Sequence, residues 1–377
     1  MRIAVNARFL TPHYIEGIGG FTGEVARRLA RDSPEHEFLF FFDRRCDPRF
    51  IFAGNVRPVV LWPPTRHPLL LLWWFEHSLA RAFARYQPAA FLSPDGFLSL
   101  RSSVPTLLVI HDLAFEHFRG HLGPLERFYC RTMVRAAARR AARIATVSAF
   151  SKRNIVETYG LEAGKIDVVS NGISEGFTPL PPDEQQRVRQ EVSGGTPYFL
   201  HVGAIQPRKN VATLLRAFDL FKQRSGANVK LLLAGRLAWR YRDVLRTHGA
   251  MAHRGEVVFL DYLPGPQLER VMASALALAC VSLHEGFGLP VAEAMACGVP
   301  AIASDRSALA EIAGDAALLV DPLDFEAIAT ALQRIAASAD LRAELARRGR
   351  ARAARFNWDT TAAAVWRALS QIAVPSR

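Results

Sequence analysis

Short apolar runs alternate with segments of helical periodicity along the whole chain. The first half carries apolar runs at residues 2–7, 37–42, 56–62, 89–94, 106–112, 143–148 and 166–172, with helices predicted at 21–32, 69–86, 124–142 and 149–158. A second series has runs at 198–203, 229–235, 257–262, 275–283, 299–304 and 316–321, with helices predicted at 210–224, 266–273, 290–297, 306–312 and 324–335. Strands that alternate with helices predict parallel α/β sheets, and the apolar strands of the second series fit a sheet buried on both faces.

The segment 173–197 separates the two series. It contains Pro179, Pro181 and Pro182 followed by a charged stretch, a composition typical of a linker. A chain of 377 residues also exceeds what one hydrophobic core usually organises. We therefore predict two doubly wound, Rossmann-like domains, 1–178 and 179–355, that face each other across a cleft. Ligands of such sheets bind outside the carboxyl ends of the strands.

Composition restricts the classes of function. The first residues, MRIAVNARFL, predict a strand rather than a secretory signal, and the longest apolar run, 68–75, is too short for a membrane span. Four cysteines without metal-ligand spacing are typical of a reduced, cytosolic protein. A net charge of +12 favours anionic partners such as nucleotides or lipid surfaces, although an arginine-rich composition alone gives the same value. No nucleic-acid-binding module is recognisable.

Two segments leave membrane contact open. Residues 67–86 combine leucines and two tryptophans with arginines, so this helix could lie in a membrane interface, although a core position is favoured. The basic stretch 131–143 either meets anionic lipid or is a solvated face.

The stretch HEGFGLPVAEAMACGVP, residues 284–300, places two acids around a glycine turn that opens a helix. Free amides at such a helix start, at Gly288 and Leu289, can bind an anion. Glu285 precedes the helix and Glu293 lies one turn inside it. Two acids beside an anion site make sense if they accept hydroxyl hydrogens while the amides hold phosphate, and a nucleotide sugar offers both groups.

This string resembles the E-x7-E signature of retaining GT-B glycosyltransferases of family 4, and the flanking AMACGVPAIASD is also similar to that family. The resemblance implies that Glu293 holds the ribose hydroxyls and that Glu285 contacts the donor sugar. It implies that Gly288 and Leu289 supply backbone amides to the donor, and Phe287 of the same turn is counted with them.

A second motif, HVGAIQPRKN at 201–210, follows the first strand of the second domain. Arg208 and Lys209 adjoin a predicted helix start at Asn210, where they would stabilise the charge of a departing diphosphate. The family usually has a lysine here, which Lys209 matches, and an arginine five residues earlier, where this chain has Ala204. One branch of the family carries PRKN, and we interpret Arg208 as the substitute.

The glycine-rich loop 14–25 contains Gly17, Gly19 and Gly20 and leads into a helix, which suits phosphate contact. It also nearly fits a dinucleotide fingerprint, with Asp43 as the ribose acid, but ten residues separate the strand from Gly17. In the family resemblance this loop closes over the donor phosphates, and arginine often stands where this chain has Gly20.

The resemblance implies three further positions. His111, at the end of the run 106–112, would line the cleft near the donor sugar, with Asp112 orienting it or capping the next turn. Backbone groups of Tyr262 and Leu263 would meet the base; the family more often has glycine at the position of Asp261. A helix over about 356–372, within a third segment 356–377, would cross back onto the first domain.

The resemblance therefore implies a retaining hexosyltransferase, and the lack of a DxD-like acid pair predicts that it needs no metal or cofactor. GDP-mannose is the favoured donor, GDP or UDP the nucleotide, and a saccharide or lipid-linked saccharide of surface polysaccharide synthesis the acceptor. The expected location is the cytoplasm, with contact to the inner membrane left open. Two alternatives stay open: an NAD(P)-dependent oxidoreductase that uses Gly17 and Gly19, and a non-catalytic two-lobed sugar-binding protein. The sequence alone predicts that Glu285→Ala abolishes transfer and leaves nucleotide affinity mostly intact.

Overall fold

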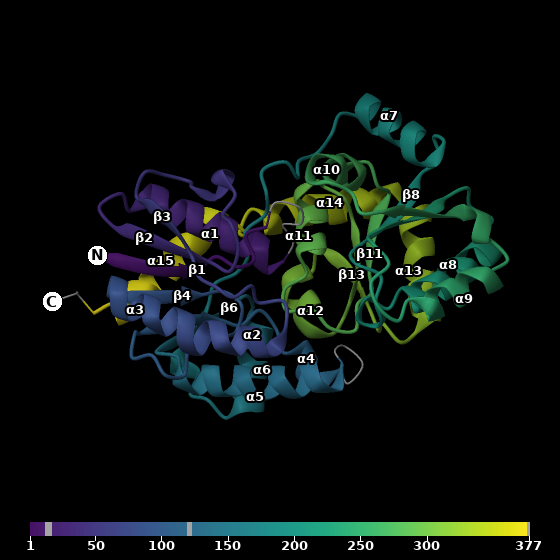
Figure 1. Ribbon diagram of the computed structural model, residues 1–377. Helices are drawn as coiled ribbons and strands as arrows, with labels where there is room; N and C mark the ends of the chain where they lie inside the picture. The colour runs from purple at the N-terminus through teal and green to yellow at the C-terminus, as the bar shows by residue number, and fades with distance from the viewer. Residues whose placement is uncertain (12–16, 119–122, 375–377) are drawn as a thin grey trace. The chain divides into compact units, whose positions relative to one another are not determined.

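A computed structural model of the chain describes residues 1–11, 17–118 and 123–374. It divides into two compact units (Figure 1): unit 1 comprises Met1–Gly172 and Asn357–Arg377, and unit 2 comprises Ile173–Phe356. The chain therefore leaves unit 1 six residues before the expected break at 178 and returns to it after Phe356.

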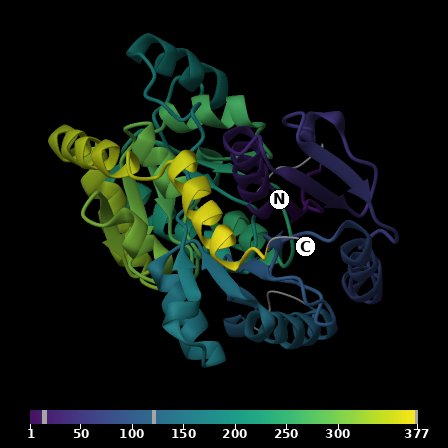
Figure 2. The same ribbon diagram turned by 90° about the vertical axis from the view of Figure 1, so that its left-hand side faces the viewer.

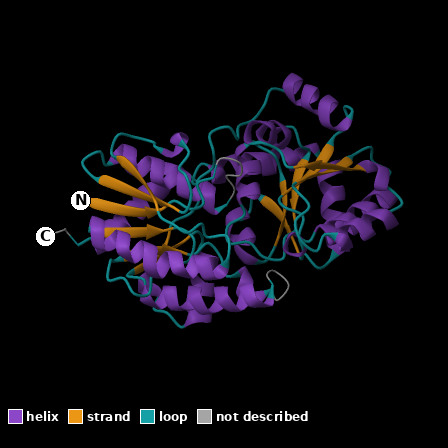
Figure 3. Ribbon diagram, viewed as in Figure 1, coloured by secondary structure: helices purple, strands orange, loops and turns teal. Residues whose placement is uncertain are grey.

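Unit 1 is built on a parallel sheet of seven strands in the order β3-β2-β1-β4-β5-β6-β7. The strands are β1 (Arg2–Asn6), β2 (Glu37–Phe42), β3 (Val56–Val60), β4 (Ala90–Ser93), β5 (Thr106–Val109), β6 (Arg143–Thr146) and β7 (Ile166–Val168). The helices are α1 (Ile18–Asp32), α2 (Pro68–Trp73), α3 (Ala80–Tyr86), α4 (Ala114–His117), α5 (Pro124–Arg140), α6 (Ala149–Tyr159) and α15 (Trp358–Ile372), with short 3-10 turns at Pro48–Phe50 and Ala163–Lys165. Because helices cover both faces of the sheet (Figure 3), β2 is buried along nearly its whole length.

Unit 2 repeats this plan with six parallel strands in the order β10-β9-β8-β11-β12-β13. The strands are β8 (Tyr198–Val202), β9 (Lys230–Ala234), β10 (Val257–Asp261), β11 (Ala277–Cys280), β12 (Ala301–Ser304) and β13 (Ala317–Val320). The helices are α7 (Pro182–Ser193), α8 (Val211–Ser225), α9 (Arg242–Ala250), α10 (Gly265–Ala273), α11 (Leu289–Ala296), α12 (Ser307–Ala313), α13 (Phe325–Ala337) and α14 (Ala339–Ala353), with 3-10 turns at Pro207–Lys209 and Arg254–Glu256. The predicted strands and the doubly wound α/β class are confirmed in both units.

Four described helices were not predicted: α4, α7, α9 and α14. α7 lies in the segment 173–197 that the sequence assigned to a linker, and it packs on α10. Pro182 occupies the first position of α7, and Gly194 follows its last turn in a left-handed conformation. Both residues are common at helix boundaries. Only Val188 and Ser193 of α7 are buried, so the segment lacks the apolar stripe that would have revealed a helix.

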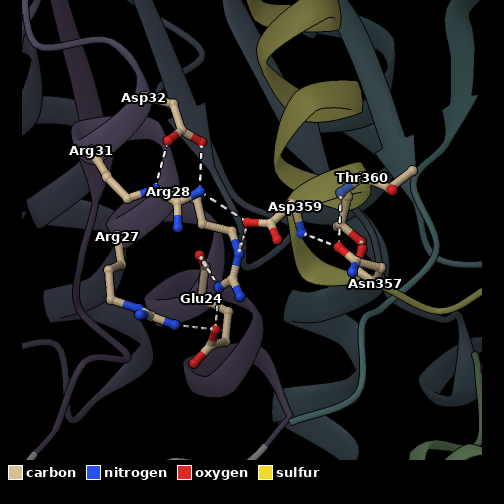
Figure 4. Close-up of polar contacts among 9 residues, drawn as sticks. Glu24, Arg27, Arg28, Arg31, Asp32, Asn357, Asp359 and Thr360 are labelled. Carbon is tan, nitrogen blue, oxygen red and sulfur yellow. Dashed lines mark hydrogen bonds and ion pairs between the residues drawn. The ribbon is translucent and has the colours of Figure 1, made fainter. Parts of the chain in front are cut away.

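The C-terminal helix α15 packs against α1 of unit 1, as the sequence predicted (Figure 1 and Figure 2). Asn357 caps it, because its side-chain oxygen accepts the backbone N–H of Asp359 at 2.6 Å. The Asp359 carboxylate in turn accepts hydrogen bonds from Arg28 at 2.8 Å and from Arg31 at 2.9 Å, both on α1 (Figure 4). Charged contacts thus attach the returning end of the chain to the first helix.

The predicted helix 69–86 is one helical stretch with a π-helical turn, Trp74–Leu79, between α2 and α3. The side chains of Trp74 and Phe75 are buried in the core of unit 1, whereas Leu69 and Trp73 on α2 are exposed. The favoured core position therefore holds for one face of this stretch and not for the other. Within the part of the chain that the structure describes, no helix is long and apolar enough to cross a membrane.

Candidate active site

The order of strands reverses between β8 and β11 in unit 2, and the predicted catalytic residues follow these two strands. Arg208 and Lys209 lie in the 3-10 turn after β8, and Glu285 lies five residues after the end of β11. In open parallel sheets, ligands bind beyond the carboxyl ends of strands at such a switch point. Glu285 and the pair Arg208 and Lys209, which are distant in sequence, therefore lie together at the edge of the sheet where folds of this class bind ligands.

Asn210 holds the loops around this switch point together. Its backbone is left-handed, with φ of 58°, and it immediately precedes α8. Its side-chain amide donates to the backbone oxygens of Val281 at 3.1 Å and Pro322 at 2.6 Å, beyond β11 and β13. A further backbone hydrogen bond, from the N–H of Leu283 to the oxygen of Arg208 at 2.8 Å, joins the two loops that carry Arg208 and Glu285. The sequence predicted a helix start at Asn210 and missed this connection.

Glu285 forms ion pairs with both predicted phosphate-binding cations. Lys209 Nζ lies 2.7 Å from Oε1 of Glu285, and Arg208 donates to Oε2 at 2.7 Å. Arg208 also donates to the backbone oxygen of His284 at 2.6 Å. Burial opposes ionisation of Glu285, but the charges of Lys209 and Arg208 outweigh it and hold the pKa of this carboxyl well below its usual range. The net charge of these three side chains is +1, which favours the binding of an anion.

The turn after Glu285 fits only glycine at one position. Gly288 has φ of 102°, and a Cβ atom there would lie 2.5 Å from Cδ2 of Leu309. Leu289 then begins α11. The ring of Phe287 is buried against Phe356, with centroids 5.3 Å apart, so Phe287 can offer a ligand only its backbone.

Glu293 lies on α11, and its carboxylate accepts no hydrogen bond from the described residues. Burial and the nearby carboxylate of Glu269 raise the pKa of Glu293 to about 7. Sequence reasoning missed Glu269, which lies on α10 and shares no motif with Glu293. Glu269 also packs over Gly176, where a Cβ atom would lie 2.2 Å from its carboxylate. A carboxylate without partners beside a second acid is a group that a hydroxyl-rich ligand can satisfy.

His201, on β8, lies beneath the ion-paired cluster and was not predicted as a site residue. It is fully buried, and Nδ1 lies 3.2 Å from the backbone oxygen of Ala279. Burial and the charge of Lys209 lower the pKa of His201 to about 4. The ring is therefore neutral at physiological pH and adds no charge to the site.

Tyr262 and Leu263 follow β10, where the sequence expected contacts to a base. Tyr262 is partly exposed, and Asp261 before it has a left-handed backbone with φ of 56°. A left-handed position explains why the family more often has glycine there, because side chains other than glycine are strained in it.

In unit 1, Gly17 precedes α1 and Gly19 and Gly20 lie in its first turn, while residues 14–16 of the predicted loop lie outside the described residues. Phe21 of α1 contacts the ring of His111 edge-on, with centroids 5.0 Å apart, so α1 and His111 are neighbours. Nε2 of His111 lies 3.0 Å from the backbone oxygen of Pro94, and burial lowers the pKa of His111.

Two acids of unit 1 have local structural partners. Asp112 accepts the backbone N–H of Ala114 at 2.9 Å at the start of α4, which is the capping role that the sequence left open. Asp43 accepts the backbone N–H of Thr65 at 2.8 Å and is ion-paired with Arg44. In the dinucleotide alternative Asp43 would bind the ribose hydroxyls, but these local partners already occupy its carboxylate.

The switch point of unit 1, between β1 and β4, holds a buried polar network that sequence reasoning missed. Arg8 follows β1 and forms an ion pair with Asp95, which follows β4. Asn6 donates to Asp95 at 2.8 Å, and Arg8 donates to Thr65 at 2.8 Å. Asp95 lies in the stretch SPDGF, residues 93–97, whereas no motif in the sequence marks Arg8.

The predicted site residues thus fall into two groups. Unit 2 brings together Glu285, Arg208 and Lys209 by direct contact, with the remaining unit 2 residues on the adjoining elements: Gly288, Leu289, Phe287, Glu293, Tyr262 and Leu263. Unit 1 holds the start of α1 beside His111. The described residues contain no cluster of His, Cys, Asp and Glu suited to a metal ion.

Comparisons with known proteins give the same division. The family model "Glycosyltransferase Family 4" matches residues 15–177, and the model "Glycosyl transferases group 1" matches residues 182–352. Among solved structures, a sucrose-phosphate synthase from Thermosynechococcus elongatus superposes with a TM-score of 0.80, over 98% of both chains at 22% identity. WaaG, a glycosyltransferase involved in lipopolysaccharide biosynthesis, superposes with a TM-score of 0.76 over 98% of this chain and 100% of WaaG, at 15% identity. These structural likenesses confirm the predicted GT-B fold.

A sequence relative covers nearly the whole chain. The O-antigen chain mannosyltransferase B of Escherichia coli is 31% identical over 92% of this chain and 93% of that protein. Together the two family models and this relative cover nearly the whole chain. The chain belongs to glycosyltransferase family 4 and is a glycosyltransferase.

Proposed function

We propose that this glycosyltransferase moves a mannosyl group from GDP-mannose to a saccharide or lipid-linked saccharide in surface polysaccharide synthesis, with retention of the anomeric configuration. The observation that carries the proposal is the cluster of Glu285, Arg208 and Lys209 at the switch point of unit 2. The mannosyltransferase relative supports the choice of sugar and of O-antigen as the class of product.

The charges of the cluster suggest how the donor enters. Arg208 and Lys209, which are paired with Glu285 in the structure, would form ion pairs with the diphosphate of the donor instead. The released carboxylate then accepts a hydrogen bond from a hydroxyl of the donor sugar. Glu293 accepts hydrogen bonds from the ribose hydroxyls, and these bonds offset the electrostatic repulsion from Glu269. Backbone amides of Gly288 and Leu289, at the start of α11, bind phosphate oxygens.

In the transfer step, the bond between the anomeric carbon and the diphosphate breaks, and the electron pair goes to the phosphate oxygen. Arg208 and Lys209 stabilise this developing charge, which is the main contribution of the chain to catalysis. The acceptor hydroxyl attacks from the same face, and the departing phosphate takes its proton. We assign contacts with the donor phosphates to Gly17, Gly19 and Gly20, and contacts with the reacting sugar to His111.

Two cations in place of a metal make the proposed reaction independent of Mg²⁺ and of any cofactor. The test is a screen of nucleotide sugars for hydrolysis and transfer, with NMR of the product linkage and with EDTA present. We expect turnover of GDP-mannose, an α-linked product and no effect of EDTA. Turnover confined to UDP-sugars contradicts the donor, a β-linked product contradicts retention, and loss of activity restored by Mg²⁺ contradicts metal independence.

We also propose that the protein acts in the cytoplasm, at the inner membrane, where a lipid-linked acceptor resides. An apolar surface of unit 1 supports this: Trp62 is 76% exposed, Leu69 is 69% exposed, and Trp73 is half exposed. Vesicle flotation tests it. The double variant Leu69→Ser, Trp73→Ser should float less than the wild type, whereas Leu323→Ser, which removes an exposed leucine from unit 2, should float equally. Equal flotation of all three proteins contradicts membrane contact through α2.

A further inference from the structure

One face of α5 in unit 1 carries four arginines at intervals of one helical turn: Arg127, Arg131, Arg135 and Arg139. Residues four apart lie on the same face of a helix, so the guanidinium groups form a row about 18 Å long. None of the motifs assigned to donor binding includes this row, and the donor-binding cluster lies in unit 2.

This row lines a cavity of about 710 Å³. Its walls consist of the four arginines together with Glu116, Phe128, Thr132 and Ala136. Among the lining residues that the structure describes, Glu116 is the acid beside four arginines, so these residues carry a charge of +3. Phe128 is 70% exposed, which is unusual for a phenylalanine and places an apolar ring at the edge of the cavity.

The arginines differ in how far the protein already occupies them. Arg127 donates to the backbone oxygens of Phe115 and Glu116, both at 2.8 Å, and Arg131 is paired with the buried carboxylate of Glu116 at 2.5 Å. These two groups are fixed by the chain.

The other end of the row is freer. Arg135 lies over the ring of Tyr159 and makes one long hydrogen bond, 3.3 Å, to the oxygen of Thr158. The guanidinium of Arg139 has no hydrogen bond or ion pair to any residue in the described ranges. Since each guanidinium carries five N–H donors, most of the donors at this end have no acceptor among the residues that the structure describes.

We propose that this groove binds a phosphate ester, with its phosphate held by Arg135 and Arg139 and its organic part lying toward Phe128. Guanidinium groups one turn apart, about 5.4 Å along the helix, are spaced so that two of them can bind one phosphate group from two sides. Four arginines in a row cannot converge on a single phosphate, so the groove accommodates an elongated or diphosphorylated ligand.

The alternative interpretation of this row is a solvated basic face. Charged side chains on such a face normally alternate in sign and pair along the helix, as Glu344 does with Arg347 and Arg348 on α14. The row on α5 has no acid within its own helix face, and it lines a groove that is open to solvent on one side. Repulsion between the arginines is therefore relieved by an external anion.

The test compares Arg135→Gln, Arg139→Gln with a matched control, Arg81→Gln, Arg140→Gln. The control removes two exposed arginines of unit 1 that do not line the cavity. The probes are inorganic pyrophosphate, measured by titration calorimetry, and vesicles of phosphatidylglycerol or of phosphatidylcholine. A donor site that also takes pyrophosphate contributes one equivalent in every variant, so the groove is identified by the equivalent that the double variant loses.

We expect the groove variant to lose affinity for a phosphate probe by about 10-fold or more, and the control to retain it. Loss for pyrophosphate identifies a soluble phosphate ester as the source, and loss for phosphatidylglycerol vesicles alone identifies a lipid headgroup. Absence of binding by the wild type, or an equal loss in the control, overturns the proposal. Arg139→Gln alone, which removes no hydrogen bond or ion pair within the described residues, serves if the double variant does not fold.

Hydrolysis of the nucleotide sugar without acceptor should stay at the wild-type rate in both variants. This measurement separates the groove from the proposed function. A protein without any transferase activity can still bind phosphate here, and an active transferase can lack the groove.

Discussion

Replacing Glu285 with glutamine tests the central feature of the candidate site. The substitution keeps the size of the side chain and removes one charge, so Arg208 and Lys209 lose the carboxylate that lies 2.7 Å from each. Glu285 and Lys209 are 8% and 9% exposed, so water compensates little for the loss. The charge of the cluster rises from +1 to +2.

The free energy of unfolding should fall by about 3–5 kcal/mol, the usual cost of removing one partner from a buried ion pair. For a unit of this size, each kcal/mol lowers Tm by about 2–4 °C. We therefore expect unit 2 of the variant to unfold at least about 6 °C below the wild type.

Nucleotide binding should change in the opposite direction. At 5 Å and an effective dielectric constant of 20, two unit charges interact by about 3 kcal/mol. A diphosphate placed against Arg208 and Lys209 no longer competes with Glu285 in the variant, and screening reduces the gain to about 1–2 kcal/mol, or about 10-fold in Kd. This revises the expectation from sequence alone that replacing Glu285 leaves nucleotide affinity mostly intact.

The assay combines thermal unfolding with and without GDP, titration calorimetry with GDP, and transfer of mannose. The variant should lose transfer, unfold earlier without ligand, and recover more stability on adding GDP than the wild type does. Glu344→Gln is the matched control, because Glu344 also lies between two arginines, Arg347 and Arg348, but on the surface of α14. It should leave Tm, GDP affinity and transfer unchanged. Weaker GDP binding by Glu285→Gln would refute the placement of the phosphate on these cations.

Two further substitutions test single groups in unit 2. The pKa of Glu293 is raised from 4.5 to about 7, so the folded state holds its proton more tightly and loses stability as pH rises from 4.5 through 7. At pH 8 the free energy of unfolding of Glu293→Gln should therefore exceed that of the wild type by about 3 kcal/mol, and at pH 5 by less than about 1 kcal/mol. The variant should also bind GDP more weakly. An equal difference in the free energy of unfolding at both pH values contradicts the shifted pKa. Asp261→Gly should raise the free energy of unfolding by about 0.5–1 kcal/mol, because glycine adopts the left-handed backbone at 261 without strain, and urea unfolding that shows a loss instead contradicts this.

The fold could be predicted from the sequence because the inner strands of both sheets are buried on both faces. An inner strand is then a compact apolar run, as in EFLFFF of β2, and the alternation with amphipathic helices is visible along the chain. The missed helices lack this signal. α14 buries only Leu345, Gly349 and Ala353 among many arginines, and its helix is defined by packing on α11 that no local pattern reports.

The candidate site could be predicted only where a motif is contiguous. The string from Glu285 to Glu293 is recognisable as a motif, and the PRKN turn contains both Arg208 and Lys209. Their ion pairs with Glu285 span 76 and 77 positions of sequence and arise because β8 and β11 are adjacent in the sheet. Glu269 and His201 were missed for the same reason: each matters through a neighbour that is distant in sequence.

The two acids of the E-x7-E string show why such contacts decide chemistry. Both are removed from bulk water, which by itself favours the neutral form. Glu285 lies against two cations and is held ionised, whereas Glu293 lies near Glu269 and is close to half protonated at pH 7. The ion pairs of Glu285 stabilise unit 2 and also occupy the two cations that a phosphate would bind, whereas the charge of Glu293 costs free energy above pH 7. In the proposed binding mode the donor would bring its diphosphate to Arg208 and Lys209 and its hydroxyl groups to Glu293, so the two acids would act on different parts of the same ligand.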